Sequence, residues 1–414
     1  MSSNSLVINR RVWASLADRI QGASLDPKVI NLSLKDVPID EALATLIVRL
    51  LQGRSFWERV YLDATGQHVV SILSCMVHMN SIERMVLFGN ESVLESEDFT
   101  NGLAANTALR YLRLRIRFTM HSEGLFQAMG QNRSIRHLHL LECEFQGGKS
   151  VEFLATALQQ NSVLESLELQ SCQLADDKIA LAVSSLLQNA SMLELNLSQN
   201  SCQRLGMEQI ASLLRSEVSK LTKLDLSRQQ GNMDIGLMAD ALRTNRLLTF
   251  LNLSGNRIND DDLDQIACSL TDNSSLQKLA INDNHITDRG VQTLSIYLPQ
   301  MAGLRELWLF ENLFGVEGAQ ALLIALRVNV VLERLHITLN EDGELLQLQR
   351  QIGFYLHLNL GGRRLLRERS VPAGLWPLVI ERASRVPWGR YVHGKSAQTD
   401  IVYCLLRCGP ILYG

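Results

Sequence analysis

Two groups of side chains in this 414-residue sequence have the chemistry to bind another molecule. Arginine, tyrosine and histidine recur between residues 59 and 139, and a tryptophan, a phenylalanine and a histidine follow between residues 308 and 336. Guanidinium and aromatic groups are the usual anchors of protein interfaces. The candidate partner-binding residues are Arg59, Tyr61, Arg84, Phe88, Tyr111, Arg113, Arg115, His137, His139, Trp308, Phe310 and His336.

Residues that could support catalysis or bind a metal lack the partners that such chemistry needs. His137 and His139 share a predicted strand face, but the sequence assigns them no carboxylate of fixed position. Cys404 and Cys408 have no neighbouring His or Cys to complete a metal site. The motifs G-x-x-x-x-G-K-[ST], G-x-S-x-G, H-E-x-x-H and C-x-x-C are absent. We therefore expect a protein that is not an enzyme and has no catalytic residues, bound metal or cofactor.

A leucine repeat determines where the candidate residues lie. Residues 248–258, 276–286 and 304–314 fit the pattern L-x-x-L-x-L-x-x-N-x-L. Twelve copies of varying quality begin at residues 29, 57, 82, 109, 135, 164, 192, 221, 248, 276, 304 and 332. The L-x-L core predicts a short strand with its leucines inward and the intervening side chain outward. The candidate binding residues occupy these outward positions.

Asparagines recur at two fixed phases of the repeat. Those in the ninth position are predicted to form a buried hydrogen-bonded ladder: Asn200, Asn256, Asn284 and Asn312. Others precede a strand by three residues, and we expect them to end helices in the left-handed conformation: Asn106, Asn132, Asn161, Asn189, Asn245, Asn273 and Asn329. Asp260, Asp261 and Asp262 begin one predicted helix, and helix capping explains them better than a cation site does.

Over residues 25–345 this pattern resembles the leucine-rich repeats of the ribonuclease-inhibitor-like subclass. The resemblance implies an α/β fold, a right-handed solenoid or horseshoe of about twelve strand–helix repeats with the candidate residues on its concave face. The subclass includes ribonuclease inhibitor, the Ran GTPase-activating protein and the sensor regions of NOD-like receptors. The fold therefore does not choose the function.

Three regions are expected. Residues 1–28 are predicted to be an N-terminal helical cap because Val12, Leu16 and Ile20 recur at helical spacing, and residues 29–343 are predicted to hold the repeats. Residues 344–414 are predicted to contain helices at about 344–360, 375–384 and 399–406, forming either a C-terminal cap or a small recruitment module. The basic residues within 363–369 indicate either a solvated helix end or a patch for nuclear import or an acidic partner.

Composition narrows the class of partner. A content of 46% hydrophobic and 20% charged residues excludes disorder as the main state. A net charge of −3 argues against nucleic acid, and no apolar run is long enough to span a membrane. The absence of a signal peptide and the odd count of 7 Cys favour a cytoplasmic location, with nuclear entry left open.

The sequence thus predicts a scaffold or adaptor that binds a protein partner on its concave face. An acidic partner surface would suit the arginine- and histidine-rich group. The alternative is a regulator of a small GTPase that resembles the Ran GTPase-activating protein. That family is expected to end in an acidic stretch, whereas this chain ends in a basic one.

Overall fold

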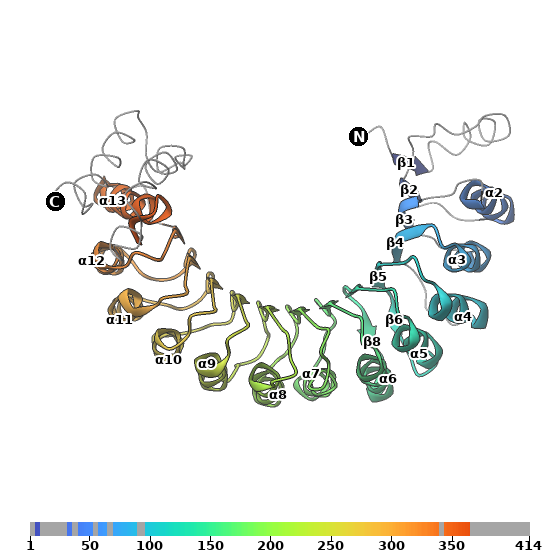
Figure 1. Ribbon diagram of the computed structural model, residues 1–414, viewed down its shortest axis with the longest axis horizontal. Coiled ribbons are helices and arrows are strands. Elements are labelled where there is room, and N and C mark those ends of the chain that lie inside the picture. Colours follow the sequence, from blue (N-terminus) through green and yellow to red (C-terminus); the bar gives the residue numbers. More distant parts are fainter. Residues whose placement is uncertain are drawn as a thin grey trace, which may run out of the picture. The chain divides into compact units, whose positions relative to one another are not determined.

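The structure is a computed structural model, and it describes residues 5–8, 31–34, 40–52, 57–63, 69–88, 96–338 and 343–364. The chain divides into two compact units, Met1–Leu221 (unit 1) and Thr222–Gly414 (unit 2). In each unit the strands of successive repeats line one face and the helices line the opposite face (Figure 1). We call the surface made by the outward side chains of the strands the strand face.

Unit 1 contains a parallel sheet whose strands follow chain order. In the described part, its strands are β1 (Ser5–Ile8), β2 (Asn31–Leu34), β3 (Trp57–Asp63), β4 (Ile82–Phe88), β5 (Tyr111–Arg115), β7 (His137–Leu140), β9 (Ser166–Glu168) and β10 (Glu194–Asn196). A small second sheet pairs β6 (Arg117–Phe118) with β8 (Glu144–Phe145). The helices are α2 (Glu41–Gln52), α3 (Val69–His78), α4 (Glu97–Ala105), α5 (Glu123–Gln131), α6 (Gly147–Gln160), α7 (Asp176–Ser184) and α8 (Arg204–Arg215).

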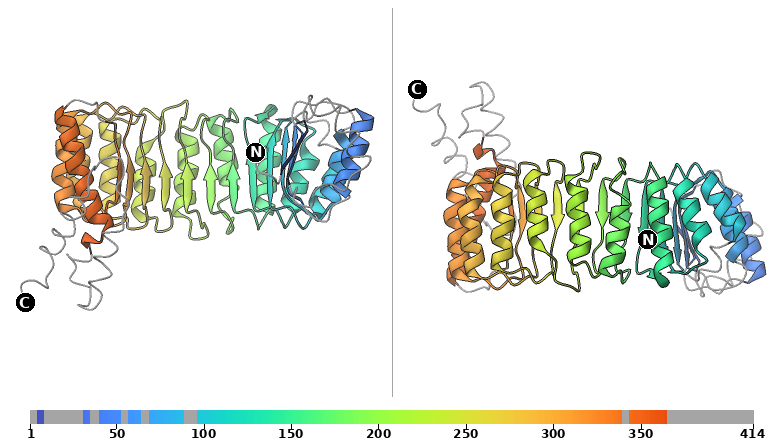
Figure 2. Two further views of the ribbon diagram at one scale, coloured as in Figure 1. Left: turned by 90° about the horizontal axis from the view of Figure 1, so that it is seen from above. Right: turned by 90° about the horizontal axis from the view of Figure 1, so that it is seen from below.

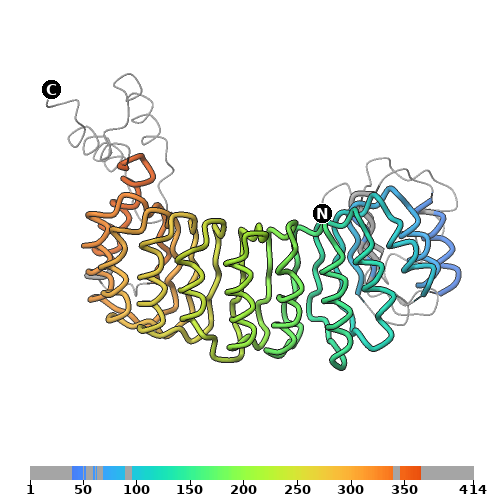
Figure 3. Tube along the Cα trace, turned by 60° about the horizontal axis from the view of Figure 1, so that its bottom comes forward, coloured from blue at the N-terminus to red at the C-terminus, as the bar shows by residue number. Residues whose placement is uncertain are grey.

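Unit 2 repeats the arrangement. Its parallel strands in the described part are β11 (Lys223–Asp225), β12 (Phe250–Asn252), β13 (Lys278–Ala280), β14 (Glu306–Trp308) and β15 (Arg334–His336). Its helices are α9 (Ile235–Thr244), α10 (Asp260–Thr271), α11 (Asp288–Tyr297), the short 3₁₀ helix η2 (Leu298–Gln300), α12 (Val316–Val328) and α13 (Gly343–Leu360). Figure 2 shows that strands lie beside strands and helices beside helices, and Figure 3 shows each unit coiling turn upon turn. The predicted α/β leucine-rich-repeat solenoid is confirmed.

The leucines of the L-x-L core fill the space between strands and helices, as expected. Leu112, Leu114, Leu251 and Leu253 have none of their surface exposed. Because neighbouring repeats share one register, equivalent outward residues form straight rows across the strands. One such row in unit 1 runs through Arg59, Arg84, Tyr111 and His137.

The ninth-position asparagines bond between repeats as predicted, and Asn200, Asn256 and Asn284 are buried, whereas Asn312 is half-buried. Asn284 is 4% exposed, and its Oδ1 accepts the backbone N–H groups of Asn256 and Ile258 at 2.8 and 3.0 Å. Its Nδ2 donates to the carbonyl oxygens of Leu253 and Ile281 at 3.2 and 2.9 Å. One side chain therefore joins consecutive repeats and satisfies backbone groups that leave the strands.

The conformation predicted for the helix-ending asparagines is wrong. Asn132 has φ −61° and ψ 138°, which is extended rather than left-handed. Its Nδ2 donates to the carbonyl oxygens of Leu103 and Asn106, at 2.7 and 3.0 Å, while its Oδ1 accepts the N–H groups of Ser134 and Ile135. Asparagine recurs here because it builds a second ladder between repeats, which requires a donor and an acceptor on one side chain.

The N-terminal region differs from the predicted cap at residues 5–8. These residues form a strand that pairs in parallel with β2, Ser5 opposite Asn31, so the sheet begins one repeat earlier than expected. In this register Leu6 lies opposite Leu32, and Ile8 lies opposite Leu34 of β2. The helical residues predicted at 12–20 lie outside the described residues.

The first helix of the tail is confirmed. Helix α13 spans Gly343–Leu360, and the Arg363 guanidinium beyond it donates to the carbonyl oxygens of Leu326 and Arg327 at the end of α12. Cationic groups stabilise the last turn of a helix in this way. The helices predicted at 375–384 and 399–406, with Cys404 and Cys408, lie outside the described residues.

Candidate protein-binding surface

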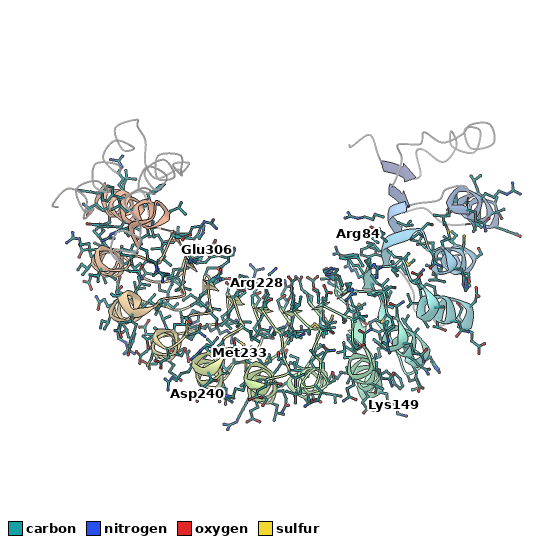
Figure 4. All side chains as sticks on the ribbon, viewed as in Figure 1. Arg84, Lys149, Arg228, Met233, Asp240 and Glu306 are labelled. Carbon is teal, nitrogen blue, oxygen red and sulfur yellow. The ribbon has the colours of Figure 1, made fainter. Side chains whose placement is uncertain are left out.

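The strand face of unit 1 carries the first group of predicted residues, which we call the unit 1 cluster: Arg59, Arg84, Tyr111, Arg113, Arg115, His137 and His139. Strands β3, β4, β5 and β7 hold them at the outward positions, as predicted. Arg59 and Arg84 are exposed, and no carboxylate of the described residues lies within ion-pair distance of either. Figure 4 shows Arg84 on the strand side of unit 1 and Lys149 on the helix side.

Aromatic rings support this cationic surface. The guanidinium carbon of Arg84 lies 5.5 Å from the centroid of the Tyr111 ring. The Tyr111 ring in turn lies 4.7 Å from the His139 ring and 6.4 Å from the His137 ring. A cation held over an aromatic face is stabilised by about 0.5–1 kcal/mol at an exposed site. The strands thus bring together four residues that the sequence had placed on three separate repeats.

A carboxylate that the sequence did not single out completes the network. The Glu168 side chain, 18% exposed on β9, forms an ion pair with His139 Nδ1 and accepts a hydrogen bond of 3.1 Å from Asn196 Nδ2. The sequence alone assigned no carboxylate to the histidines, and the structure places Glu168 beside His139. The residue step of 29 from His139 to Glu168 places the two at one register, which is the signal that could have found the pair.

Burial and charge act in opposite directions on Glu168. Burial alone would raise the pKa of its carboxyl group, but the hydrogen bond and charge of His139, with the charge of Arg113, outweigh burial and lower that pKa. Glu168 is therefore ionised in neutral solution and neutralises the interior edge of the cluster. The exposed edge at Arg59 and Arg84 keeps its positive charge.

The remaining predicted residues of unit 1 lie at the borders of this network. Arg115 is exposed and pairs with Glu142. Arg113 is half-buried, and its Nε is buried without a hydrogen-bond partner. Phe88 is half-buried on β4. The Cα of Tyr61 lies opposite Val86, while its side chain is outside the described atoms.

On the strand face of unit 2, the predicted residues Trp308 and His336 lie with three residues that were not predicted, Lys278, Glu306 and Arg334. We call these five residues the unit 2 cluster. Its centre is the carboxylate of Glu306, whose side chain is 8% exposed. Oε1 accepts the indole N–H of Trp308 at 2.9 Å and lies 3.3 Å from His336 Nε2. Oε2 accepts from Arg334 Nη1 at 3.0 Å and lies 3.3 Å from Lys278 Nζ. Figure 4 shows Glu306 on the strand side of unit 2.

These four donors determine the ionisation of Glu306. Burial would raise its pKa, but the hydrogen bond from Trp308 and the charges of Lys278 and Arg334 outweigh burial and lower it. From the sequence alone, Trp308, Phe310 and His336 were selected as binding residues, whereas Lys278, Glu306 and Arg334 were not. Their outward positions in adjacent repeats, Lys278 opposite Glu306 and Glu306 opposite Arg334, were the available signal.

Trp308 is less exposed than the sequence suggested. The residue is half-buried, and its ring meets the His336 ring edge-on, with centroids 5.5 Å apart and planes at 77°. Ala280 occupies the same row on β13 and is 1% exposed, because neighbouring side chains cover this small residue. Phe310 follows Trp308 by two residues and is also half-buried.

Of the three aspartates at the start of α10, Asp262 takes part in the predicted helix capping, whereas Asp260 bonds to Thr287 at the start of α11. Asn259 and Asp262 form a reciprocal capping box, and Asp260 accepts the N–H and hydroxyl of Thr287 at 2.8 and 2.6 Å. Across the described ranges, no group of three His, Cys, Asp or Glu side chains is arranged to hold a metal ion. Within the same ranges, no helix is long and apolar enough to cross a lipid bilayer.

Comparison with known sequences agrees with the repeat geometry. A family model described as Leucine Rich repeat matches residues 244–267 and 272–295, which include β12, most of α10, β13 and most of α11. The protein has a leucine-rich-repeat fold. No curated protein matches its sequence.

Two solved structures of partial similarity are actin-binding site 2 of leiomodin-1 and the C-terminal domain of tropomodulin from Caenorhabditis elegans. The first has 20% identity and a TM-score of 0.34, and the match covers 40% of this leucine-rich-repeat chain and 92% of the leiomodin chain. The second has 17% identity and a TM-score of 0.33, and the match covers 39% of this chain and 98% of the tropomodulin chain.

Proposed function

We propose that this protein is a non-enzymatic scaffold that binds a protein partner on its strand face, with the unit 1 cluster contacting an acidic part of that partner. The observation that carries the proposal is the pair Arg59 and Arg84, two exposed cations opposite each other on β3 and β4. Among the described residues, no carboxylate lies within ion-pair distance of either arginine. Two adjacent like charges repel one another, so an isolated fold gains nothing from this pairing. An anionic partner would remove the repulsion.

The surroundings of the two arginines suit a protein partner. Both arginines lie on paired strands, Tyr111 supports the Arg84 guanidinium, and His137 continues the same row. A preformed surface loses little conformational entropy on binding. Arginine also binds carboxylates through paired hydrogen bonds, which gives specificity as well as charge attraction.

The repeat length supports the finer assignment to the ribonuclease-inhibitor-like subclass. Full helices, such as the 14-residue α6 and the 13-residue α12, return the chain between strands. Such helices fit repeats of about 28 residues better than the shorter repeats of other leucine-rich proteins. The subclass does not by itself specify a partner.

The test is affinity capture from native lysate with the full chain and two charge-matched variants. Arg84→Glu reverses one charge on the strand face, whereas Lys149→Glu makes the same change in charge at an exposed position of α6. We expect the wild type and Lys149→Glu to capture one partner in similar amounts. Arg84→Glu should recover about 10-fold less of that partner, or none. Equal recovery with all three proteins would reject the proposal.

The same experiment addresses regulation of a small GTPase, the alternative that the resemblance raised. If the partner lost with Arg84→Glu is a small GTPase, its nucleotide hydrolysis is measured with and without the wild-type protein. An unchanged hydrolysis rate would leave binding as the function and exclude GTPase activation for that partner.

A further inference from the structure

The unit 2 cluster forms a second binding site of different construction. We propose that it takes an acidic side chain of a protein partner together with a neighbouring apolar side chain, the carboxylate binding Lys278 and Arg334 and the apolar group resting on Trp308. This inference rests on the proposed scaffold function, because it names what one part of the same strand face binds.

Glu306 organises the site and is not available as a ligand itself. Its two oxygens already contact four donors that come from β13, β14 and β15. Only 8% of its side chain is exposed. A carboxylate so occupied acts as a positioning residue, because it fixes the directions of the cations and of the indole ring.

The cations around Glu306 retain free capacity toward solvent. The side chains of Lys278, Arg334 and His336 are 50%, 56% and 45% exposed. An ammonium group has three donors and a guanidinium group has five, and Glu306 engages one atom of each. In the described part of the chain, Glu306 is the one carboxylate paired with Lys278 or Arg334, so two permanent positive charges face one negative charge. The excess favours an anion.

The indole supplies the apolar part of the site. Its N–H points inward to Glu306, and its edge meets His336, so the ring has a fixed orientation. The one polar group of the Trp308 side chain is therefore already hydrogen-bonded within the protein, and the rest of the side chain is hydrocarbon. Tryptophan and arginine are enriched among the residues that contribute most to binding at protein interfaces, and both occur here side by side.

A neighbouring ion pair leaves this excess charge intact. Glu333 precedes Arg334 in sequence, but its carboxylate pairs with Arg305 Nη1 at 2.5 Å. It therefore does not neutralise Arg334. The partner segment we infer is an Asp or Glu within about two residues of a Leu, Ile, Phe or Trp, because that spacing matches the distance from the cations to the indole within adjacent strands.

The test uses a displayed library of 12-residue peptides selected on the full chain and counter-selected on Trp308→Ala. We expect the recovered peptides to carry an acidic residue beside an apolar one. A synthetic peptide from this pool should bind Trp308→Ala at least about 10-fold more weakly than the wild type. Phe250→Ala, an outward aromatic residue on β12 of the same strand face, is the matched control and should bind normally.

A double-mutant cycle then assigns the acidic residue to its contacts. Replacing Asp by Asn (or Glu by Gln) in the peptide should weaken binding to the wild type by about 5-fold and to Lys278→Ala/Arg334→Ala by less than about 2-fold. If the acidic peptide and its amide variant differed in affinity by the same factor for the wild type and for Lys278→Ala/Arg334→Ala, the proposal would be overturned. Recovery of peptides without acidic residues would also overturn it. If Trp308→Ala does not fold, the cycle decides alone, since both cationic side chains are half-exposed.

The outcome is separable from that of the proposed function. Peptide binding to the unit 2 cluster should be unchanged in Arg84→Glu. If peptides bind as expected and no cellular partner depends on Arg84, only the role of the unit 1 cluster is rejected. If an Arg84-dependent partner is found and no peptide depends on Trp308, only the second site is rejected.

Discussion

The unit 1 and unit 2 clusters each place cations beside a glutamate on a strand face, but they arrange these charges differently. Each places cations on strands at a spacing of about 4.8 Å and each includes a histidine paired with a glutamate. In unit 2 the glutamate lies at the centre, where Glu306 contacts four donors and is 8% exposed. In unit 1 the glutamate lies at one side, where Glu168 contacts His139 and leaves Arg59 and Arg84 exposed. The position of one carboxylate thus determines how much of the positive charge in each cluster is paired within the fold and how much faces solvent.

The largest expected effect tests this difference in stability. Glu306→Gln should lower the free energy of unfolding by about 2 kcal/mol, because the amide keeps one acceptor and turns an N–H₂ group toward cationic donors. Glu168→Gln should cost about 1 kcal/mol, because fewer donors depend on it. Urea unfolding followed by circular dichroism measures both values. Glu333→Gln, which breaks only the pair with Arg305, is the control and should change stability by less than about 0.5 kcal/mol. A larger loss for Glu168→Gln than for Glu306→Gln would contradict the comparison.

The next effect is the dependence of stability on pH. The pKa of Glu306 and of Glu168 is lowered in the folded protein from the ordinary value of 4.5. A carboxyl group whose pKa is lower in the folded state binds its proton more readily when unfolded. Its contribution to stability is therefore complete above about pH 4.5 and is lost as the pH falls through the folded-state pKa.

Urea midpoints measured between pH 6 and pH 3 would show this contribution. The wild type should lose stability below pH 4.5 more steeply than Glu306→Gln, because the variant lacks the titrating group. The difference between the two proteins should shrink by about 1 kcal/mol over that range. Parallel curves for the two proteins would show that Glu306 has the same pKa folded and unfolded.

Sequence reasoning predicted the repeat well because the repeat depends on local pattern. Leucines at L-x-L positions must face inward in any strand of this length, and a common repeat step forces rows such as Arg84, Tyr111 and His137. The sequence-based prediction did not select Glu168 or Glu306, because ion pairing depends on which side chains on neighbouring strands come within contact distance. Glu306 and Asp225 both occupy outward strand positions, yet only Glu306 has cations on both neighbouring strands.

The asparagine positions show the same limit. The recurrence of asparagine three residues before a strand predicted a structural role for Asn132 and its equivalents. In the structure, Asn132 has none of its surface exposed. The physical reason differed, because a helix-ending residue with extended backbone cannot be recognised from its own helix. Its role depends on carbonyl groups about 26 to 29 residues earlier in the chain. The strand at Ser5–Ile8 was not predicted for a related reason. A segment of four residues has little pattern of its own, and this one forms a strand by pairing with the edge of β2.

The smallest effect concerns the hydroxyl group of Tyr111. Its oxygen lies 3.3 Å from His139 Nδ1, and that nitrogen already pairs with Glu168. Tyr111→Phe removes this long contact and keeps the ring on which the Arg84 guanidinium rests, so stability should fall by no more than about 0.5 kcal/mol. Partner capture through Arg84 should persist in Tyr111→Phe and weaken in Tyr111→Leu, which removes the ring. Loss of capture with Phe would mean that the hydroxyl contacts the partner directly, and unchanged capture with Leu would mean that Arg84 needs no aromatic support. In either case the unit 1 cluster would differ from the unit 2 cluster more than the placement of a carboxylate alone explains.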